Sequence, residues 1–210
     1  MRLTVFGATG GTGRHVTRQA LAAGHRVTAV VRDPARLPQI DHPRLDPVIA
    51  DVMNSEAIRP AVAGQDAVVS ALGPRARRDA PVCADGASAI ITAMRAEGIR
   101  RLIVVTASGH VVDAGDGPFT RAVVKPMLRR YLREGFADFA RTEQVVRDND
   151  LDWTIMRPPR LTDGRQRPYR TAIDRNVRGG FTIARVDLAR AILAALDDPT
   201  TAGHTISLGY

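Results

Sequence analysis

The chain has 210 residues, of which 25% are charged and 44% hydrophobic, and its formal net charge is +8. This length suffices for one sizeable α/β domain with a core, and no apolar run of about 18 residues is present that would span a membrane. Glycines break the apolar stretch at the N-terminus, so no signal peptide is expected. A single cysteine, Cys83, excludes an internal disulfide and gives no metal-binding spacing. These features favour the cytoplasm.

The positive charge raises the question of nucleic-acid binding. The arginines are spread from Arg2 to Arg190, and one local cluster is formed by Arg129, Arg130 and Arg133. Few aromatic residues accompany them, so stacking platforms for single strands are lacking. Nucleic-acid binding is therefore disfavoured. A basic face that meets an anionic cofactor is expected instead, or a solvated face without a partner.

Lysine is almost absent from the chain. Of the 30 basic residues, Lys125 is the only lysine. Arginine stays charged and serves poorly as an acid, a base or a Schiff-base former, so any mechanism that needs a lysine must use Lys125.

The chain begins with an apolar run at residues 3–6, which is typical of a buried strand. Four glycines follow, at Gly7, Gly10, Gly11 and Gly13. Apolar residues then recur at helical spacing over residues 14–23, and strand, glycine turn and helix in this order predict a dinucleotide site. Glycine lets the backbone turn tightly and approach a pyrophosphate, while the helix N-terminus favours the anion. The alternative is a glycine-rich turn that binds nothing.

The rest of the chain alternates apolar runs with helical patterns. Strands are expected at residues 27–31, 47–50, 67–71, 102–106, 153–157 and 205–208, and helices at 55–62, 86–97, 136–149 and 186–196. This alternation predicts a single α/β domain over residues 1–210, with a Rossmann-type doubly wound parallel sheet and helices on both faces. Residues 110–135 and 158–182 lack clear periodicity and are expected to form irregular loops, either on the substrate side or as surface padding.

The end of the second expected strand carries residues that choose between NAD and NADP. Arg32 follows this strand directly, and Arg36 comes one helical turn later. A guanidinium here would pair with the 2′-phosphate of NADP, whereas an acidic residue would bind the ribose of NAD. Asp33 could face the ribose, or it could cap the short helix that follows. NADP(H) is therefore favoured over NAD(H).

Further candidates follow the third, fourth and fifth expected strands. Asp51 could accept the adenine amino group with Val52 against the ring, or it could cap the next helix. Gly73 allows close approach of the backbone to a cofactor, or simply forms a turn. Hydroxyl groups of Thr106 and Ser108 lie where a nicotinamide carboxamide or a substrate carbonyl would bind.

Serine-nucleophile and metal chemistry are not indicated. The chain has no Gly-x-Ser-x-Gly elbow, and no carboxylate partner for His110 is evident. The histidines show no metal-ligand spacing and are expected as polar surface or cap residues, at His15, His25, His42, His110 and His204.

Several segments together look like those of a known family: residues 7–13 (Gly-Ala-Thr-Gly-Gly-Thr-Gly), 30–34, 51–52, 64–68, 70–73 and 153–159 (Trp-Thr-Ile-Met-Arg-Pro-Pro). The chain resembles atypical short-chain dehydrogenase/reductases of the NAD(P)H-binding, NmrA-like type. Within these it is most similar to the NADPH-dependent flavin reductase/biliverdin-IXβ reductase branch. The resemblance covers nearly the whole chain and implies cofactor contacts at Gly7, Thr9, Gly10, Thr12, Gly13, Arg32, Asp51, Val52, Leu72, Gly73 and Arg75. The residues themselves add Gly11, Arg36 and Thr106 as cofactor candidates.

The resemblance also implies a substrate site over the nicotinamide, at the ends of the fifth and sixth strands. Here those ends are residues 106–109 and 158–161, and the substrate candidates are Ser108, Gly109, Pro158 and Arg160. Where the reductase branch has a Thr-Ser pair, this chain has Thr106-Ala107-Ser108. Arg160 stands where that branch tends to have a histidine.

The Tyr-x-x-x-Lys pair of the larger superfamily is absent, because Arg121 stands four residues before Lys125. Alcohol oxidation by the usual route is therefore disfavoured. Hydride transfer to a flavin, a quinone or another planar conjugated acceptor remains open, because such acceptors take their proton from water. If a dedicated acid exists, Ser108 is the first candidate.

The sequence thus predicts an NADPH-dependent reductase of a small aromatic acceptor, with any flavin acting as a substrate and not as a tightly bound group. The alternative is a non-catalytic NADP(H)-binding regulator of the NmrA-like type. In that case the basic residues 121–133 would bind a protein partner.

Overall fold

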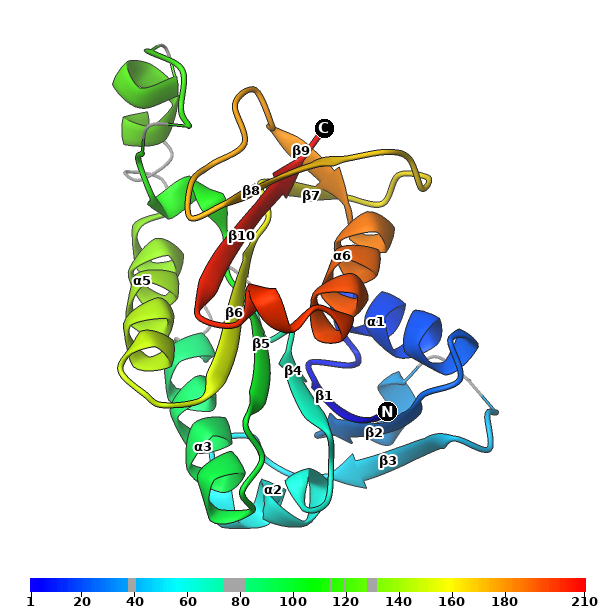
Figure 1. The fold of residues 1–210 in the computed structure, drawn as a ribbon. Coiled ribbons are helices and arrows are strands. Elements are labelled where there is room, and N and C mark those ends of the chain that lie inside the picture. The colour runs from blue at the N-terminus through cyan, green and yellow to red at the C-terminus, as the bar shows by residue number, and fades with distance from the viewer. Residues whose placement is uncertain (38–40, 74–81, 114, 119, 128–131) are drawn as a thin grey trace.

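The computed structural model describes residues 1–210 except 38–40, 74–81, 114, 119 and 128–131 (Figure 1). Within the described residues a large sheet has the strand order β3-β2-β1-β4-β5-β6-β10-β8. Its pairs are parallel except for the antiparallel pair of β10 and β8. The strands are β1 (Arg2–Phe6), β2 (Arg26–Val31), β3 (Leu45–Ile49), β4 (Ala67–Ser70), β5 (Arg101–Val105), β6 (Asp152–Arg157), β8 (Arg170–Ile173) and β10 (His204–Gly209).

Helices cover both faces of this sheet, so the predicted Rossmann-type α/β fold is confirmed (Figure 1). The helices α1 (Gly11–Ala22) and α6 (Arg185–Asp197) lie on one face. The helices α2 (Ser55–Val62), α3 (Cys83–Ala96) and α5 (Arg133–Arg147) lie on the other. Alternation along β1 explains the two layers: Val5 packs toward α1 and α6, whereas Phe6 packs toward α2 and α3.

Three helices begin three residues earlier than their sequence pattern predicts. The helix α1 starts at Gly11 and not at residue 14, α3 starts at Cys83 and not at residue 86, and α5 starts at Arg133 and not at residue 136. The start of α3 depends on a distant residue, because the Asp138 carboxylate of α5 accepts hydrogen bonds from the amides of Cys83 and Ala84, both at 3.0 Å. Burial, and next the Asp138 carboxylate, raise the pKa of the Cys83 thiol far above its ordinary value, so the thiol stays neutral.

The stretch 158–182 was expected to be irregular, and this is wrong in part. It contains β7 (Arg160–Thr162), β8 and the start of β9 (Thr182–Ala184), and β7 pairs with β9 in a small parallel sheet. Each of these strands has only three or four residues, which is too short for the apolar alternation that identifies a strand in a sequence.

The stretch after β5 contains the short helices η2 (Ser108–His110) and η3 (Thr120–Val124). Lys125 follows them and is buried, and its Nζ donates to the Asp116 carboxylate at 2.6 Å and to the carbonyl of Val111. Asn176 donates to the same carboxylate through Nδ2 at 3.2 Å. The lysine is therefore held in a structural ion pair with Asp116. Asn176, which shares this carboxylate, links the ion pair to the loop after β8.

Candidate functional site

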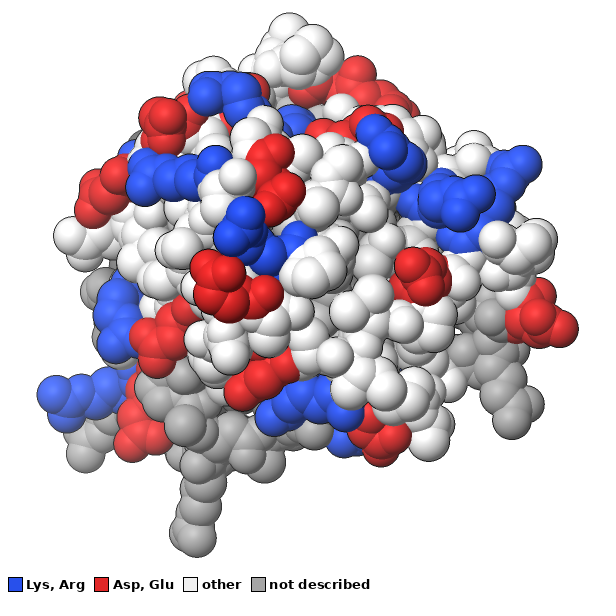
Figure 2. Space-filling model, turned by 90° about the horizontal axis from the view of Figure 1, so that it is seen from below, with Lys and Arg blue, Asp and Glu red and all other residues white. Residues whose placement is uncertain are grey.

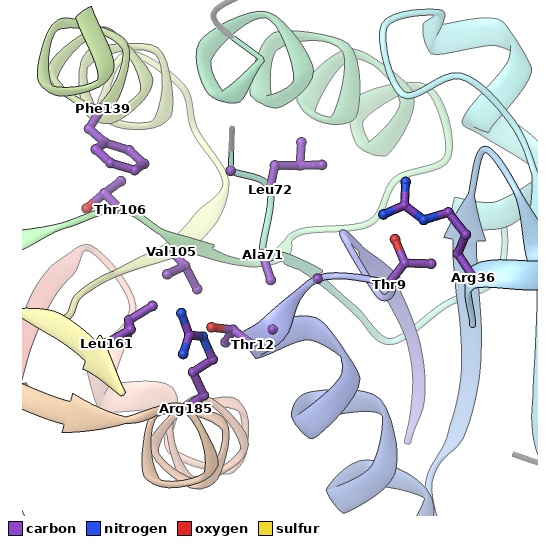
Figure 3. A pocket seen from close by; sticks show the side chains of 13 residues that line it. Thr9, Thr12, Arg36, Ala71, Leu72, Val105, Thr106, Phe139, Leu161 and Arg185 are labelled. Atoms are coloured by element: carbon purple, nitrogen blue, oxygen red, sulfur yellow. The ribbon is translucent and has the colours of Figure 1, made fainter. Parts of the chain in front are cut away.

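A cavity of about 450 Å³ opens at the carboxyl ends of β1, β4 and β5. In this doubly wound sheet the order of the strands reverses between β1 and β4. The crevice at such a switch point is where ligands bind. Figure 3 shows the cavity as an elongated groove with Arg36 and Thr9 at one end, Thr106 and Phe139 at the other, and Thr12 with Arg185 between them. The lining residues are Thr9, Gly10, Gly11, Thr12, Arg36, Ala71, Leu72, Gly73, Val105, Thr106, Phe139, Leu161 and Arg185.

The glycine turn has a geometry that other residues cannot adopt. Gly7 has a φ of 77°, and a Cβ added there would lie 2.4 Å from the Ala71 carbonyl oxygen. A Cβ on Gly13 would lie 2.1 Å from the carbonyl oxygen of Gly7. The turn is closed by a hydrogen bond from the Gly10 amide to the Gly7 carbonyl at 2.9 Å. These glycines therefore hold β1, the turn and α1 in close contact.

The first turn of α1 is built to face an anion. The Arg14 amide donates to the Gly10 carbonyl at 3.1 Å, so the amides of residues 11–13 precede the first helical hydrogen bond. Gly10 caps the helix without a side chain. These amides and the helix dipole favour a phosphate at the floor of the groove.

Two arginines were predicted at this end of the groove. Both are exposed, but Arg36, which lies in η1 (Pro34–Arg36), lines the groove beside Thr9, whereas Arg32 is not among the lining residues (Figure 3). Asp33 accepts a hydrogen bond from the Ala35 amide at 3.0 Å and thus caps η1, as one of the two interpretations expected.

Asp51 and Val52 are not among the residues that line the groove. The Asp51 carboxylate accepts a hydrogen bond from the Met53 amide at 3.1 Å, and the cap of α2 is instead Asn54. Val52 packs with Leu72 around Gly86. Arg75 lies outside the described residues.

The other end of the groove is mainly apolar. Val105, Leu161 and Phe139 form its walls, and Leu72 covers its side (Figure 3). Thr106 lies at the base, where its hydroxyl donates to the Glu143 carboxylate at 2.9 Å. These apolar walls favour a hydrophobic ligand group, while the hydroxyl proton of Thr106 is already donated to Glu143.

Behind Thr106 lies a buried ionic network centred on Glu143. Arg157 donates to this carboxylate through Nε at 2.7 Å and also through Nη2, and Arg147 adds a bond at 3.0 Å. Burial by itself would raise the pKa of Glu143, but the bonds from Arg157 and His110 outweigh it and hold the pKa far below its ordinary value. Glu143 therefore stays ionised and joins β5, β6 and α5.

The expectation that His110 is a surface or cap residue without a carboxylate partner is wrong. His110 is buried, its Nε2 lies 3.3 Å from Glu143 Oε1, and its Nδ1 lies 2.6 Å from the carbonyl oxygen of Ala107. The partner was not evident because Glu143 is 33 residues away in sequence, on another element. The ring fastens the loop after β5 to α5.

The four predicted substrate residues lie near the apolar end but do not line it. Ser108 donates its amide to the Pro158 carbonyl at 2.8 Å, and Pro158 is buried. A Cβ on Gly109 would meet the Phe136 ring at 2.6 Å. Arg160 is exposed, and the next residue of β7, Leu161, faces the groove instead.

Among the lining residues, Ala71 and Leu161 fall within the ranges 70–73 and 158–161 that the sequence indicates, whereas sequence reasoning missed Val105, Phe139 and Arg185. Val105 ends the apolar strand β5, and Ala71 follows the apolar strand β4. The apolar run is the only local sequence pattern that points to either residue. Phe139 and Arg185 reach the groove from helices, and their positions depend on how α5 and α6 pack. No local pattern in the sequence identifies them.

Among the residues that the structure describes, no cluster of three or more His, Cys, Asp or Glu side chains is arranged to hold a metal ion. In the same part of the chain no helix is long and apolar enough to cross a membrane.

The parallel sheet with its switch-point groove, glycine turn and uncapped helix N-terminus defines a Rossmann-type dinucleotide-binding protein. The chain belongs to the NAD(P)H-binding family, which it matches over residues 7–199.

Several known proteins are similar to this chain in sequence, and solved structures share its fold. YwnB, an uncharacterized protein of Bacillus subtilis, is 26% identical over 207 residues, which cover 95% of this chain and 93% of YwnB. A 3-diazoavenalumate denitrifying reductase of a Streptomyces species is 32% identical over 75% of this chain and 55% of the reductase. A short-chain dehydrogenases/reductase of Veillonella parvula, solved in complex with NADP, has the same fold, with a TM-score of 0.84, 20% identity and coverage of 100% of this chain and 94% of that chain. Some relatives are much longer, since the chain spans only 12% of the mycobacterial protein Rv2047c.

Proposed function

We propose that this protein is an NADPH-dependent reductase that transfers hydride to a planar conjugated acceptor such as a flavin or a quinone. The observation that carries the proposal is the two-part groove, in which the glycine turn adjoins an apolar compartment formed by Val105, Phe139 and Leu161. The family that the chain belongs to binds NAD(P)H, and one relative bears the name of a reductase. The bound cofactor supplies the hydride.

The residues present fit this cofactor. The amides of residues 11–13 and the Arg36 guanidinium would hold its phosphates, and Leu72 with Val105 would position its reactive end. The apolar walls exclude water and orient the acceptor, and such positioning supplies roughly 7–11 kcal/mol of a barrier. No lysine assists, because Lys125 is buried against Asp116 and is not among the lining residues.

The proposal predicts that the purified protein oxidises NADPH when a flavin or a quinone is added. Loss of NADPH absorbance over a panel of acceptors measures this. Phe139→Ala should raise the KM for the acceptor while the Kd for NADPH stays unchanged, because Phe139 lies at the end of the groove remote from the glycine turn.

Binding of NADPH without oxidation above background at any acceptor would contradict the reductase. It would favour the alternative, a non-catalytic NADP(H)-binding regulator with a protein partner. Such a regulator would bind oxidised and reduced cofactor equally well.

The proposal also includes a preference for NADPH that depends on Arg36. Arg36→Ala should weaken NADPH binding roughly ten- to a hundredfold and leave NADH binding nearly unchanged, because only NADPH carries the 2′-phosphate. The matched control is Arg32→Ala, which removes the same charge from an exposed residue outside the lining set and should have a smaller effect. Calorimetric titration with both nucleotides measures the two variants. Equal losses for NADPH and NADH would show that Arg36 does not read the 2′-phosphate.

A further inference from the structure

Arg185 is the first residue of α6, but its side chain lies over the first residue of α1. A Cβ on Gly11 would be 2.6 Å from Arg185 Nε and 2.8 Å from its Cδ, so the arginine side chain lies directly against the backbone of Gly11 and a larger residue there would displace it. Figure 3 shows the guanidinium beside Thr12, in the middle of the groove. The Arg185 guanidinium therefore lies over the N-terminus of α1, where an anion is expected.

The position of Arg185 is costly for α6 itself. A cation in the first turn opposes the helix dipole, which favours negative charge there. The start of α6 is nevertheless fixed, because the buried Asp187 carboxylate accepts hydrogen bonds from Tyr210 Oη at 2.6 Å and from the Arg167 amide at 3.1 Å. Because Asp187 fixes the start of α6, Arg185 stays in this unfavourable position. This arrangement indicates that the charge of Arg185 has a function in the groove.

The partner of Arg185 in this structure is a weak one. Its Nη1 donates to Asp163 Oδ1 at 2.8 Å, and the Asp163 side chain is 72% exposed. An exposed carboxylate offers a screened interaction, because water competes for both charges. A pyrophosphate held at the same time by the amides of residues 11–13 would be a stronger partner, since it accepts charge-assisted bonds from a planar guanidinium.

We propose that Arg185 is a pyrophosphate-binding residue that exchanges Asp163 for the dinucleotide when the cofactor binds. Asp163 then acts as a competitor, which holds the arginine over the empty turn and lowers the affinity for the cofactor. This inference rests on the dinucleotide-binding part of the proposed function and not on hydride transfer.

The first test is the Kd of the purified protein for NADPH and for NADH, measured by calorimetry. Arg185→Ala should weaken both nucleotides equally, by roughly ten- to a hundredfold, because the pyrophosphate is common to them. This pattern differs from that of Arg36→Ala, which should affect NADPH alone. Arg185→Lys, which keeps the charge but loses the planar fork, should have an intermediate Kd and guards against a variant that fails to fold.

The second test is a double-mutant cycle that separates exchange of partners from a general effect of charge. Asp163→Asn should tighten nucleotide binding roughly two- to fivefold in the wild-type background, because the arginine is released. In the Arg185→Ala background the same change should have no effect. Tightening that persists without Arg185 would show that Asp163 acts by long-range repulsion and would overturn the exchange.

The remaining outcomes also decide. If Arg185→Ala leaves both Kd values unchanged but raises the KM for an anionic acceptor, Arg185 belongs to the acceptor and the inference falls while the proposed reductase stands. If wild-type protein binds neither nucleotide, the inference and the proposed function fall together.

Discussion

Replacing Gly13 by alanine is expected to destabilise the protein by about 3 kcal/mol and to abolish nucleotide binding. The new Cβ would lie 2.1 Å from the carbonyl oxygen of Gly7, 2.7 Å from its carbonyl carbon and 2.9 Å from Ala8 Cα. All three are backbone atoms of the glycine turn, so the clash cannot be relieved by a change of rotamer. The turn and α1 must move apart, and the anion site at residues 11–13 moves with them.

Thermal unfolding measures this effect, and a loss of that size lowers the Tm by roughly 6–12 °C. The control is Gly164→Ala, since a Cβ there would meet Thr162 and Ala184 at the ordinary distances of 3.6 and 3.8 Å. Its free energy of unfolding should stay within about 0.5 kcal/mol of the wild type. A Gly13→Ala protein with the wild-type Tm would mean that the turn is not packed as described.

The second large effect is expected from Glu143→Gln. Removing the charge leaves Arg157 buried with a neutral partner, and breaking such a buried pair costs about 3–5 kcal/mol. Both side chains are less than one-tenth exposed, at 3% and 8%, so water does not replace the lost interaction. The matched control is Glu97→Gln. The Glu97 carboxylate pairs with the 42%-exposed Arg59 at 2.8 Å, so this substitution should lower the free energy of unfolding by only about 0–1 kcal/mol.

This variant should also change the dependence of stability on pH. The pKa of Glu143 is lower in the folded protein than its ordinary value of 4.5, so its stabilising contribution is fully present above pH 4.5. As the pH falls below 4.5 the unfolded state takes up the proton first, and this contribution is lost progressively. Denaturant titrations over that acidic range should therefore show a shallower loss of stability for Glu143→Gln than for the wild type. Parallel profiles would show that Glu143 does not contribute to acid unfolding.

The charge of +8 does not gather into a single basic face in the view of Figure 2. Arginines and carboxylates alternate there. Ion pairs of the described surface, such as Arg95 with Asp150 at 3.0 Å and Arg100 with Asp152 at 3.1 Å, combine both signs.

The sheet and the glycine turn could be predicted from the sequence because their signals are local. Apolar runs buried on both sides mark β1, β4 and β5, and glycines mark the turn wherever backbone atoms come too close for a Cβ. The absence of a Tyr-x-x-x-Lys pair can also be read from residue spacing alone. Arg36 could be predicted as a cofactor residue because it follows β2 closely in the sequence.

The parts that could not be predicted depend on contacts between distant elements. The start of α3 is set by Asp138, and the partner of His110 is Glu143, both from α5. The Arg185 side chain lies against Gly11, which is far away in the sequence. Sequence patterns report which side of an element is buried, but they do not report which neighbouring element buries it.

One turn and a half of α5 contacts three parts of the molecule at once. Asp138 caps α3, Phe139 lines the groove, and Glu143 holds β5 and β6 through Thr106 and Arg157. Sliding or rotating this helix to admit a larger acceptor would break the cap and the ionic network together. The apolar end of the groove can therefore change its shape through the side chain at position 139, while the helix that carries it keeps its register.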